Sequence, residues 1–167
     1  MARIRQIGVP IAFGAAGLLA AAAYGAEKPQ LGWIELVRFL PENLIVTAKL
    51  DTGADTSSVD AKDLTEFERG GRPWVRFSVS NHKGDTAVFE RPVVRVVRIK
   101  RSETKTTTRP VVMLAICLGG KFREEPVTLT DRSHLSYRVL IGRSVMAGRF
   151  LENPALKFTT RPNCLSR

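Results

Sequence analysis

One carboxylate in this chain, Asp51, lies directly after a strand-like run, a position from which it could take part in hydrolysis of a peptide bond. Asp51 follows residues 44–50, in which apolar residues alternate with others, and it is followed by Thr52 and Gly53. A glycine lets another backbone segment approach closely, and a threonine hydroxyl can hydrogen-bond across such a junction. The same tripeptide is also compatible with an ordinary turn, so its meaning depends on a second feature.

An aspartate hydrolyses a peptide bond without a metal only as one of a pair. One carboxylate activates a water while a second, protonated carboxyl polarises the carbonyl, and two such groups side by side share one proton because they cannot both ionise. Asp-Thr-Gly occurs once in the chain, at residues 51–53. The second carboxylate must then come from an identical subunit across a two-fold axis, so this chemistry predicts a homodimer.

The second feature is an apolar run ending in glycine, VLIGR at residues 139–143. With LDTGAD at 50–55 and VLIGR in this order, the chain resembles the retropepsin-like aspartic proteases, in which such a run passes behind the aspartate loop. The resemblance implies that Asp51 is the catalytic carboxylate. It also implies that the following residues shape its loop or lie behind it: Thr52, Gly53, Ala54, Leu140, Ile141, Gly142 and Arg143.

The resemblance is closest to a bacterial branch of that group, often labelled ATP-dependent zinc proteases and frequently encoded beside ATP-grasp peptide ligases. Four further segments look like this branch: 31–37, 72–79, 109–112 and 140–154. They imply a mainly β fold, a small closed retropepsin-like barrel with one short C-terminal helix. The chain has only His82 and His134 for imidazole, no His-Glu-x-x-His and no glycine-rich phosphate loop, so we expect no metal and no cofactor.

The elements that must position these residues are short runs separated by turn formers, as in a mainly β domain. The pattern predicts strands over 44–50, 74–80, 93–100, 111–118, 121–130 and 138–142, a helical turn over 143–148, and a closing segment over 149–158. Residues 93–100 and 111–118 are expected to pair. Residues 80–85 predict a hairpin turn, and the hairpin over 80–90 is the candidate flap that closes over substrate.

The first part of the chain differs from the rest. Arg3 and Arg5 precede an uncharged stretch from Ile7 to Ala26, rich in alanine, glycine and leucine. This pattern predicts either a cleaved signal peptide or an N-terminal membrane anchor. We therefore expect three parts, a signal or anchor over 1–26, a protease domain over 31–158 and a tail over 159–167. The protein would be exported, in the periplasm or anchored facing it.

The chain is strongly basic, with 26 lysines and arginines against 16 acidic residues and a formal charge of +10. Such an excess favours anionic partners, here an acidic peptide or an anionic membrane surface, and an exported location argues against nucleic acid. Several of the basic residues are expected on one hairpin: Arg95, Arg98, Lys100, Arg101, Lys105 and Arg109. The alternative is that they form an ordinary solvated face.

Two other features leave alternatives open. An oxidising compartment permits a disulfide between Cys117 and Cys164, but Cys117 lies in an apolar run, which favours a free, buried cysteine. The segment Leu129–Arg132 and Arg143 are similar to positions of the same branch that support the dimer or the active loop. Alternatively, each arginine is a surface residue paired with an acid.

These observations predict an aspartic endopeptidase that acts on peptides or proteins through a water held between Asp51 of two subunits. A different class is a non-catalytic retropepsin-like module that binds peptides as the partner of an ATP-grasp ligase or membrane complex. A third is a membrane-tethered scaffold that uses only the N-terminal segment and the basic face.

Overall fold

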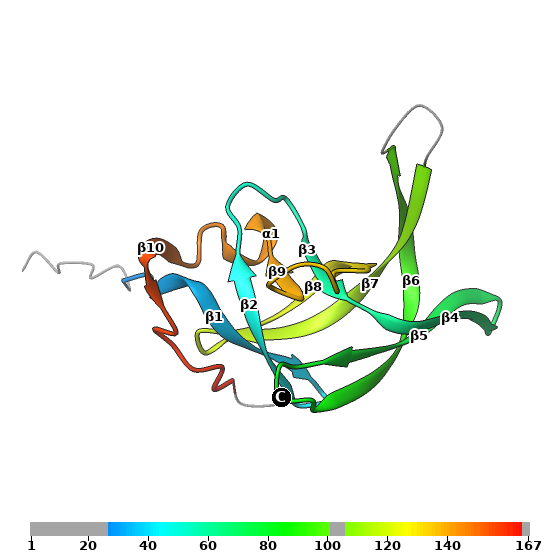
Figure 1. The fold of residues 1–167 in the computed structure, drawn as a ribbon, viewed down its shortest axis with the longest axis horizontal. Coiled ribbons are helices and arrows are strands. Elements are labelled where there is room, and N and C mark those ends of the chain that lie inside the picture. Colours follow the sequence, from blue (N-terminus) through cyan, green and yellow to red (C-terminus); the bar gives the residue numbers. More distant parts are fainter. Residues whose placement is uncertain (1–26, 101–105, 165–167) are drawn as a thin grey trace, which may run out of the picture.

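The computed structural model describes residues 27–100 and 106–164, which form ten strands and one short helix (Figure 1). The predicted signal or anchor segment over 1–26 lies outside the described residues. Among those that are described, no helix is both long and apolar enough to cross a membrane. The elements in chain order are β1 (Gln30–Leu40), β2 (Leu44–Leu50), β3 (Ser57–Asp60), β4 (Lys62–Arg69), β5 (Arg72–Ser80), β6 (Thr86–Lys100), β7 (Thr106–Leu118), β8 (Lys121–Thr130), β9 (Val139–Ile141), α1 (Arg143–Met146) and β10 (Leu151–Lys157).

Six strands form a closed barrel. The order around it is β1, β2, β9, β3, β8 and β7, and the pairing of β7 with β1 completes the ring. Two of the pairings, β2 with β9 and β3 with β8, are parallel. The predicted mainly β barrel with one short helix is therefore confirmed.

The barrel closes around side chains that alternate along its strands. In β2, Leu44, Val46, Ala48 and Leu50 are buried, which leaves residues 45, 47 and 49 on the outer face. A period of two puts Asp51 on the side of Lys49. The buried face of β2 therefore determines that the Asp51 carboxylate emerges on the outer face of the barrel.

The remaining strands extend the sheet beyond the barrel. The first half of β6 pairs with β5 and the second half with β7, so β6 leaves the ring and continues into a smaller sheet with β5 and β4. The predicted pairing of 93–100 with 111–118 is confirmed in part of its length, with Val93 opposite Val112. Strand β7 starts earlier than predicted, at Thr106, and its outer half projects with β6 from the barrel (Figure 1).

The C-terminal segment returns to the barrel instead of ending as a free tail. Strand β10 pairs in parallel with the start of β1, and the Phe158 N–H donates to the Ile34 carbonyl at 2.8 Å. Glu35 of β1, although fully buried, then accepts hydrogen bonds from the backbone N–H and hydroxyl groups of both Thr159 and Thr160, at 2.6–3.1 Å. A fifth bond comes from the Gly32 N–H at 2.7 Å.

A disulfide between Cys117 and Cys164 holds the end of the same segment against β7, with a Cα–Cα distance of 5.8 Å. The prediction that favoured a free, buried Cys117 is therefore wrong. Its sulfur is buried, as the apolar run indicated, but the returning segment brings Cys164 beside it. Nothing in the sequence around Cys164 showed that this segment would fold back.

Candidate functional site

The Asp51 carboxylate lies half-buried at the exit of β2 and is held by backbone groups. The Asp51 N–H donates to the Ile141 carbonyl at 2.9 Å, and the Asp51 carbonyl accepts from the Ala54 N–H at 3.2 Å. The Gly53 N–H donates to Asp51 Oδ1 at 2.9 Å. These bonds keep one carboxylate oxygen facing its own loop, and no residue in the described ranges donates a hydrogen bond to the other oxygen.

The segment Leu140–Arg143 lies directly behind this loop. Strand β9 pairs in parallel with β2, with Ile141 opposite Leu50, and the Arg143 N–H donates to the Ala54 carbonyl at 2.8 Å. A Cβ atom at Gly142 would lie 2.6 Å from the carbonyl carbon of Thr56. Because that neighbour is backbone, the loop can approach β9 this closely only if residue 142 is a glycine.

Arg143 ties the two ends of the loop together. Its guanidinium forms an ion pair with the Asp55 carboxylate and donates to the Thr52 carbonyl at 2.8 Å. These contacts position the loop. They also show that Arg143 is paired with an acid, so both interpretations given for Arg143 in the sequence analysis apply.

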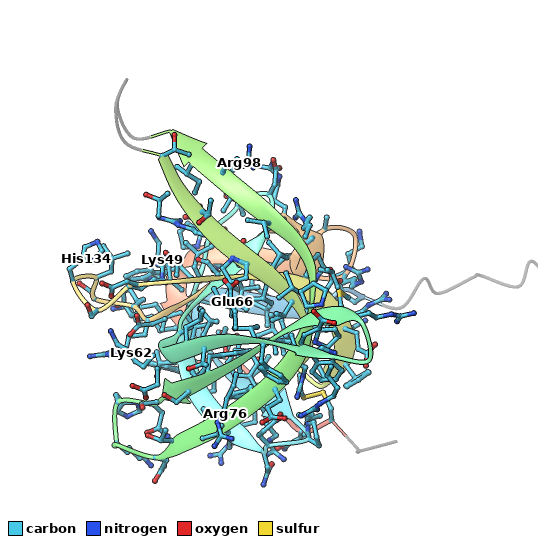
Figure 2. The ribbon with its side chains drawn as sticks, turned by 90° about the vertical axis from the view of Figure 1, so that its right-hand side faces the viewer. Lys49, Lys62, Glu66, Arg76, Arg98 and His134 are labelled. Atoms are coloured by element: carbon cyan, nitrogen blue, oxygen red, sulfur yellow. A yellow bond between two sulfur atoms is a disulfide. The ribbon has the colours of Figure 1, made fainter. Side chains whose placement is uncertain are left out.

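A row of three outward-facing residues lies beside Asp51. Leu140 of β9 is opposite Lys49 of β2 on one side and opposite Ser58 of β3 on the other. All three are partly exposed, and Figure 2 shows Lys49 at the surface of the barrel. We call this row, together with Asp51, the Asp51 face.

Arg132 extends over the Asp51 face from the loop after β8. Its Nη1 donates to Ser58 Oγ at 3.1 Å and its Nε to the Tyr137 carbonyl at 3.2 Å. Its backbone N–H donates to Asp60 Oδ1 at 2.6 Å, and the other oxygen of this buried carboxylate accepts from Arg138 at 2.9 Å. Of the predicted segment 129–132, Arg132 is thus the residue that reaches the site.

The electrostatics of Arg132 connect it with the candidate catalytic group. Burial lowers the pKa of its guanidinium, the charge of Asp60 raises this pKa, Arg109 lowers it, and Asp51 raises it. The Arg132 charge therefore interacts with both Asp51 and Arg109. Arg109 comes from β7 and lines a surface hollow with Thr130 and Asp131, the residues just before Arg132.

The hairpin over residues 80–90 is not placed to cover Asp51 of its own subunit. The predicted turn is present, with Ser80 opposite Thr86. However, the Asn81 side chain donates to the Ile45 carbonyl, near the start of β2, whereas Asp51 follows the end of that strand. At about 3.3 Å per residue the two points are about 20 Å apart, so the flap prediction is wrong for this hairpin. The turn packs at the opposite end because Phe77 and Phe89 anchor β5 and β6 in the core, with ring centroids 5.2 Å apart.

The predicted basic cluster is only partly described. Arg95, Arg98 and Arg109 lie on the β6–β7 hairpin, and Figure 2 shows Arg98 on its projecting half. Lys100 is the last residue of β6, and Arg101 and Lys105 fall outside the described residues. His82 and His134 are both exposed, and a search of the described ranges finds no group of three or more His, Cys, Asp or Glu side chains that could hold a metal ion.

Comparisons with known proteins match most of the described chain. A family described as retropepsin-like aspartic endopeptidase RimB (RimB-like) matches residues 30–163. A protein of Shewanella pealeana named "Probable alpha-L-glutamate ligase" is 35% identical over 116 residues, which is 68% of this chain and 25% of that protein. A protein of the same name from Desulfotalea psychrophila is 34% identical over 115 residues, again 25% of its length. The chain thus spans a quarter of the length of these relatives.

A solved structure shares the fold. It is the crystal structure of Lpg0085 from Legionella pneumophila, described as a protein of unknown function (DUF785). The TM-score is 0.70 and the sequence identity 38%, over 81% of this chain and all of that one. The described barrel is therefore similar to an experimentally determined one along most of its length.

Proposed function

Because the chain belongs to the RimB-like family of retropepsin-like aspartic endopeptidases, we propose that it hydrolyses peptide bonds with a water held between Asp51 of two subunits. One observation carries the proposal. The Asp51 carboxylate emerges on the outer face at the end of a buried strand and accepts a hydrogen bond from the Gly53 N–H on one oxygen. Its second oxygen has no hydrogen-bond donor among the described residues and would share a proton with the same group of a partner subunit.

The reaction divides two roles between the paired carboxyls. The ionised carboxylate removes a proton from the water as its oxygen attacks the peptide carbonyl carbon, while the protonated carboxyl hydrogen-bonds the carbonyl oxygen. The tetrahedral intermediate then collapses, the C–N bond breaks, and the amide nitrogen leaves with a proton returned by the pair. The Gly53 N–H holds one oxygen of Asp51 in place during these steps.

We propose that the substrate is an acidic peptide. The chain carries a formal charge of +10, and Lys49 and Arg132 lie on or over the Asp51 face. Relatives named as alpha-L-glutamate ligases contain a similar segment, and this name connects the segment with glutamate. Peptides that contain glutamate are therefore the first substrates to test.

The test compares the wild-type protein with Asp51→Asn on a peptide library rich in glutamate, from acidic to neutral pH. Removing the carboxylate should lower the cleavage rate by about 10²-fold to 10⁴-fold, the usual contribution of general acid–base catalysis. Cleavage at the same rate by both proteins would contradict the proposal. The folded state of the variant is checked by its melting temperature.

The alternative function is a non-catalytic module that binds peptides beside a ligase. It is favoured by one observation, the similar segment within relatives that are themselves named ligases. The same experiment separates the two functions, because binding without cleavage by either protein would support the module.

We also propose that the protein is exported, and the disulfide between Cys117 and Cys164 supports this location, since disulfides persist in oxidising compartments. Residues 1–26 would supply the signal or anchor. A reporter that is active only outside the cytoplasm, fused after residue 167, would test this. Activity of the reporter that persists when residues 1–26 are deleted would contradict it.

A further inference from the structure

We propose that Arg132 selects an acidic side chain close to the scissile bond by binding its carboxylate with the guanidinium group. The inference deepens the proposed function, because it takes the Asp51 face as the surface on which the peptide lies. It assigns the choice of substrate to Arg132, which lies outside both Asp-Thr-Gly at 51–53 and VLIGR at 139–143.

The first argument is position. The Arg132 guanidinium lies against Ser58 Oγ at 3.1 Å, and Ser58 belongs to the same row of strand residues as Leu140 and Lys49. Asp51 directly follows the strand that carries Lys49 and emerges on the same side of it. A peptide that presents its carbonyl group to Asp51 therefore has Arg132 within reach of a neighbouring side chain.

The second argument is the state of the charge. The oxygens that accept from the guanidinium, Ser58 Oγ and the Tyr137 carbonyl, are both neutral. The nearest acid, Asp60, is occupied by the Arg132 backbone N–H and by Arg138, and within the described ranges no ion pair to the Arg132 side chain is formed. The charges of Asp60 and Asp51 favour the charged form of the half-buried guanidinium, but neither carboxylate accepts a hydrogen bond from its side chain.

The third argument is the surrounding field. Burial, the largest cause, and the like charge of Arg109 lower the pKa of Arg132; the charges of Asp60 and Asp51 raise it, and the net effect is a lowered pKa. A carboxylate of the peptide bound to Arg132 would offset the effects of burial and of the Arg109 charge. The planar guanidinium suits this role, since it can donate two parallel hydrogen bonds to one carboxylate. The apolar side chain of Leu140 would contact the methylene groups of a glutamate.

The experiment uses pairs of peptides that differ only by glutamate or glutamine at one position. Binding is measured with the full chain carrying Asp51→Asn, so that no turnover is needed. The test variant adds Arg132→Gln, and a second variant adds Arg132→Lys, which keeps the charge but not the planar fork. The matched control adds Arg76→Gln, which removes the same charge from an exposed arginine of β5, outside the barrel ring (Figure 2).

The Asp51→Asn protein should bind the glutamate peptide about 10-fold to 100-fold more tightly than its glutamine twin, as expected for a hydrogen-bonded charge pair. Arg132→Gln should remove this preference, Arg132→Lys should retain part of it, and Arg76→Gln should leave it unchanged. The proposal is overturned if Asp51→Asn itself shows no preference, or if Arg132→Gln binds both peptides with the original ratio. The first outcome is measured on Asp51→Asn alone, so the proposal can be overturned even if Arg132→Gln does not fold.

The outcome is independent of catalysis. A preference that depends on Arg132 without any cleavage by the wild type would remove the proposed peptidase and keep this inference. If cleavage depended on Asp51 but proceeded at equal rates for both peptides, the proposed peptidase would stand and the role of Arg132 would be overturned.

Discussion

Asp51 takes its orientation from backbone donors, and this has a consequence for its neighbours. The groups that hold it belong to Gly53, Ala54 and Ile141, and none of these contacts involves a side chain other than its own. Substitutions at other positions of this loop should therefore be tolerated if they leave the backbone conformation unchanged. Substitutions whose side chains overlap with the loop backbone should displace Asp51.

Gly142→Ala is the sharpest test of this idea. Its Cβ atom would lie 2.6 Å and 2.7 Å from the carbonyl carbon and oxygen of Thr56, so the loop must move. We expect a loss of about 1–3 kcal/mol in the free energy of unfolding, as for other overpacked sites, together with loss of peptide cleavage. Urea unfolding and the cleavage assay measure the two effects.

Gly120→Ala is the control for this substitution. Gly120, unlike Gly142 with its φ of −91°, has a positive φ of +75°, and a Cβ atom there would meet no heavy atom within 4 Å. This variant should lose stability through backbone strain and keep its cleavage rate. If Gly142→Ala cleaved peptides as well as Gly120→Ala, the close approach of β9 to the loop would not matter for function.

At the scale of single residues, the sequence located the aspartate loop and the segment behind it but not their partners. Asp-Thr-Gly and the glycine of VLIGR carry local signals, because each needs a particular backbone geometry. Arg132 was noticed only as part of a segment, and nothing showed that it would reach Ser58. The contact depends on how the loop after β8 folds, which is a long-range property.

At the scale of elements, Glu35 organises the joint between β1 and the C-terminal segment. It is fully buried, yet its pKa is lowered, because hydrogen bonds from Thr159, Gly32 and Thr160 outweigh the effect of burial, which is the largest single cause and acts in the opposite direction. The charged form is thus the native one. A glutamate in an otherwise apolar strand gave no hint of this role.

Glu35→Gln should destabilise the protein by about 1–3 kcal/mol at neutral pH, because an amide nitrogen would face N–H and O–H donors. The folded pKa lies below the ordinary value of 4.5, so the stabilisation is present above that pH and is lost as the pH falls through the folded pKa. The difference between wild type and variant should therefore shrink on acidification. Urea unfolding at several pH values from 7 to 3 measures it.

Glu68→Gln serves as the control for the pH series. Glu68 lies exposed on β4, at the edge of the sheet, and the same charge is removed there without disturbing the joint. A wild-type advantage over Glu35→Gln that stayed constant from pH 7 to 3 would contradict the role assigned to the Glu35 charge.

The disulfide gives a second prediction for the same joint. It links residues 47 apart in sequence, for which loss of the cross-link costs about 2–4 kcal/mol. A reductant should therefore lower the urea midpoint of the wild type. Cys164→Ala should have the lower midpoint already and should not respond to the reductant. An unchanged wild-type midpoint under reducing conditions would show that the cross-link adds nothing.

Most strands were predictable because they alternate or are continuously apolar, as β2 and β8 show. Strand β4 was not predicted, because its residues are mainly polar and it lies at the edge of the sheet with little buried surface. The hairpin over 80–90 was predicted as an element but misplaced as a flap. Local pattern gives the turn, whereas its place relative to Asp51 depends on aromatic packing between Phe39, Phe77 and Phe89.

At the scale of the whole molecule, the proposed mechanism requires two chains, because Asp-Thr-Gly occurs once in each. Cleavage rate per subunit should rise with protein concentration and level off as the dimer becomes saturated. Sedimentation over the same range should give a matching transition. Mixing in an excess of the Asp51→Asn chain should reduce the activity, because mixed dimers would hold only one carboxylate. Full activity of a strictly monomeric protein would contradict the mechanism.

The C-terminal segment is held by two ties of unlike chemistry, and this gives the fold a form of redundancy. One tie is a covalent disulfide, which reduction breaks, and the other is a set of hydrogen bonds to the charged Glu35 carboxylate, which protonation weakens. A reducing medium near neutrality leaves the carboxylate tie in place, and an acidic oxidising medium leaves the sulfur bridge. Surroundings that are both acidic and reducing would weaken the two ties together and leave the segment with the pairing of β10 with β1.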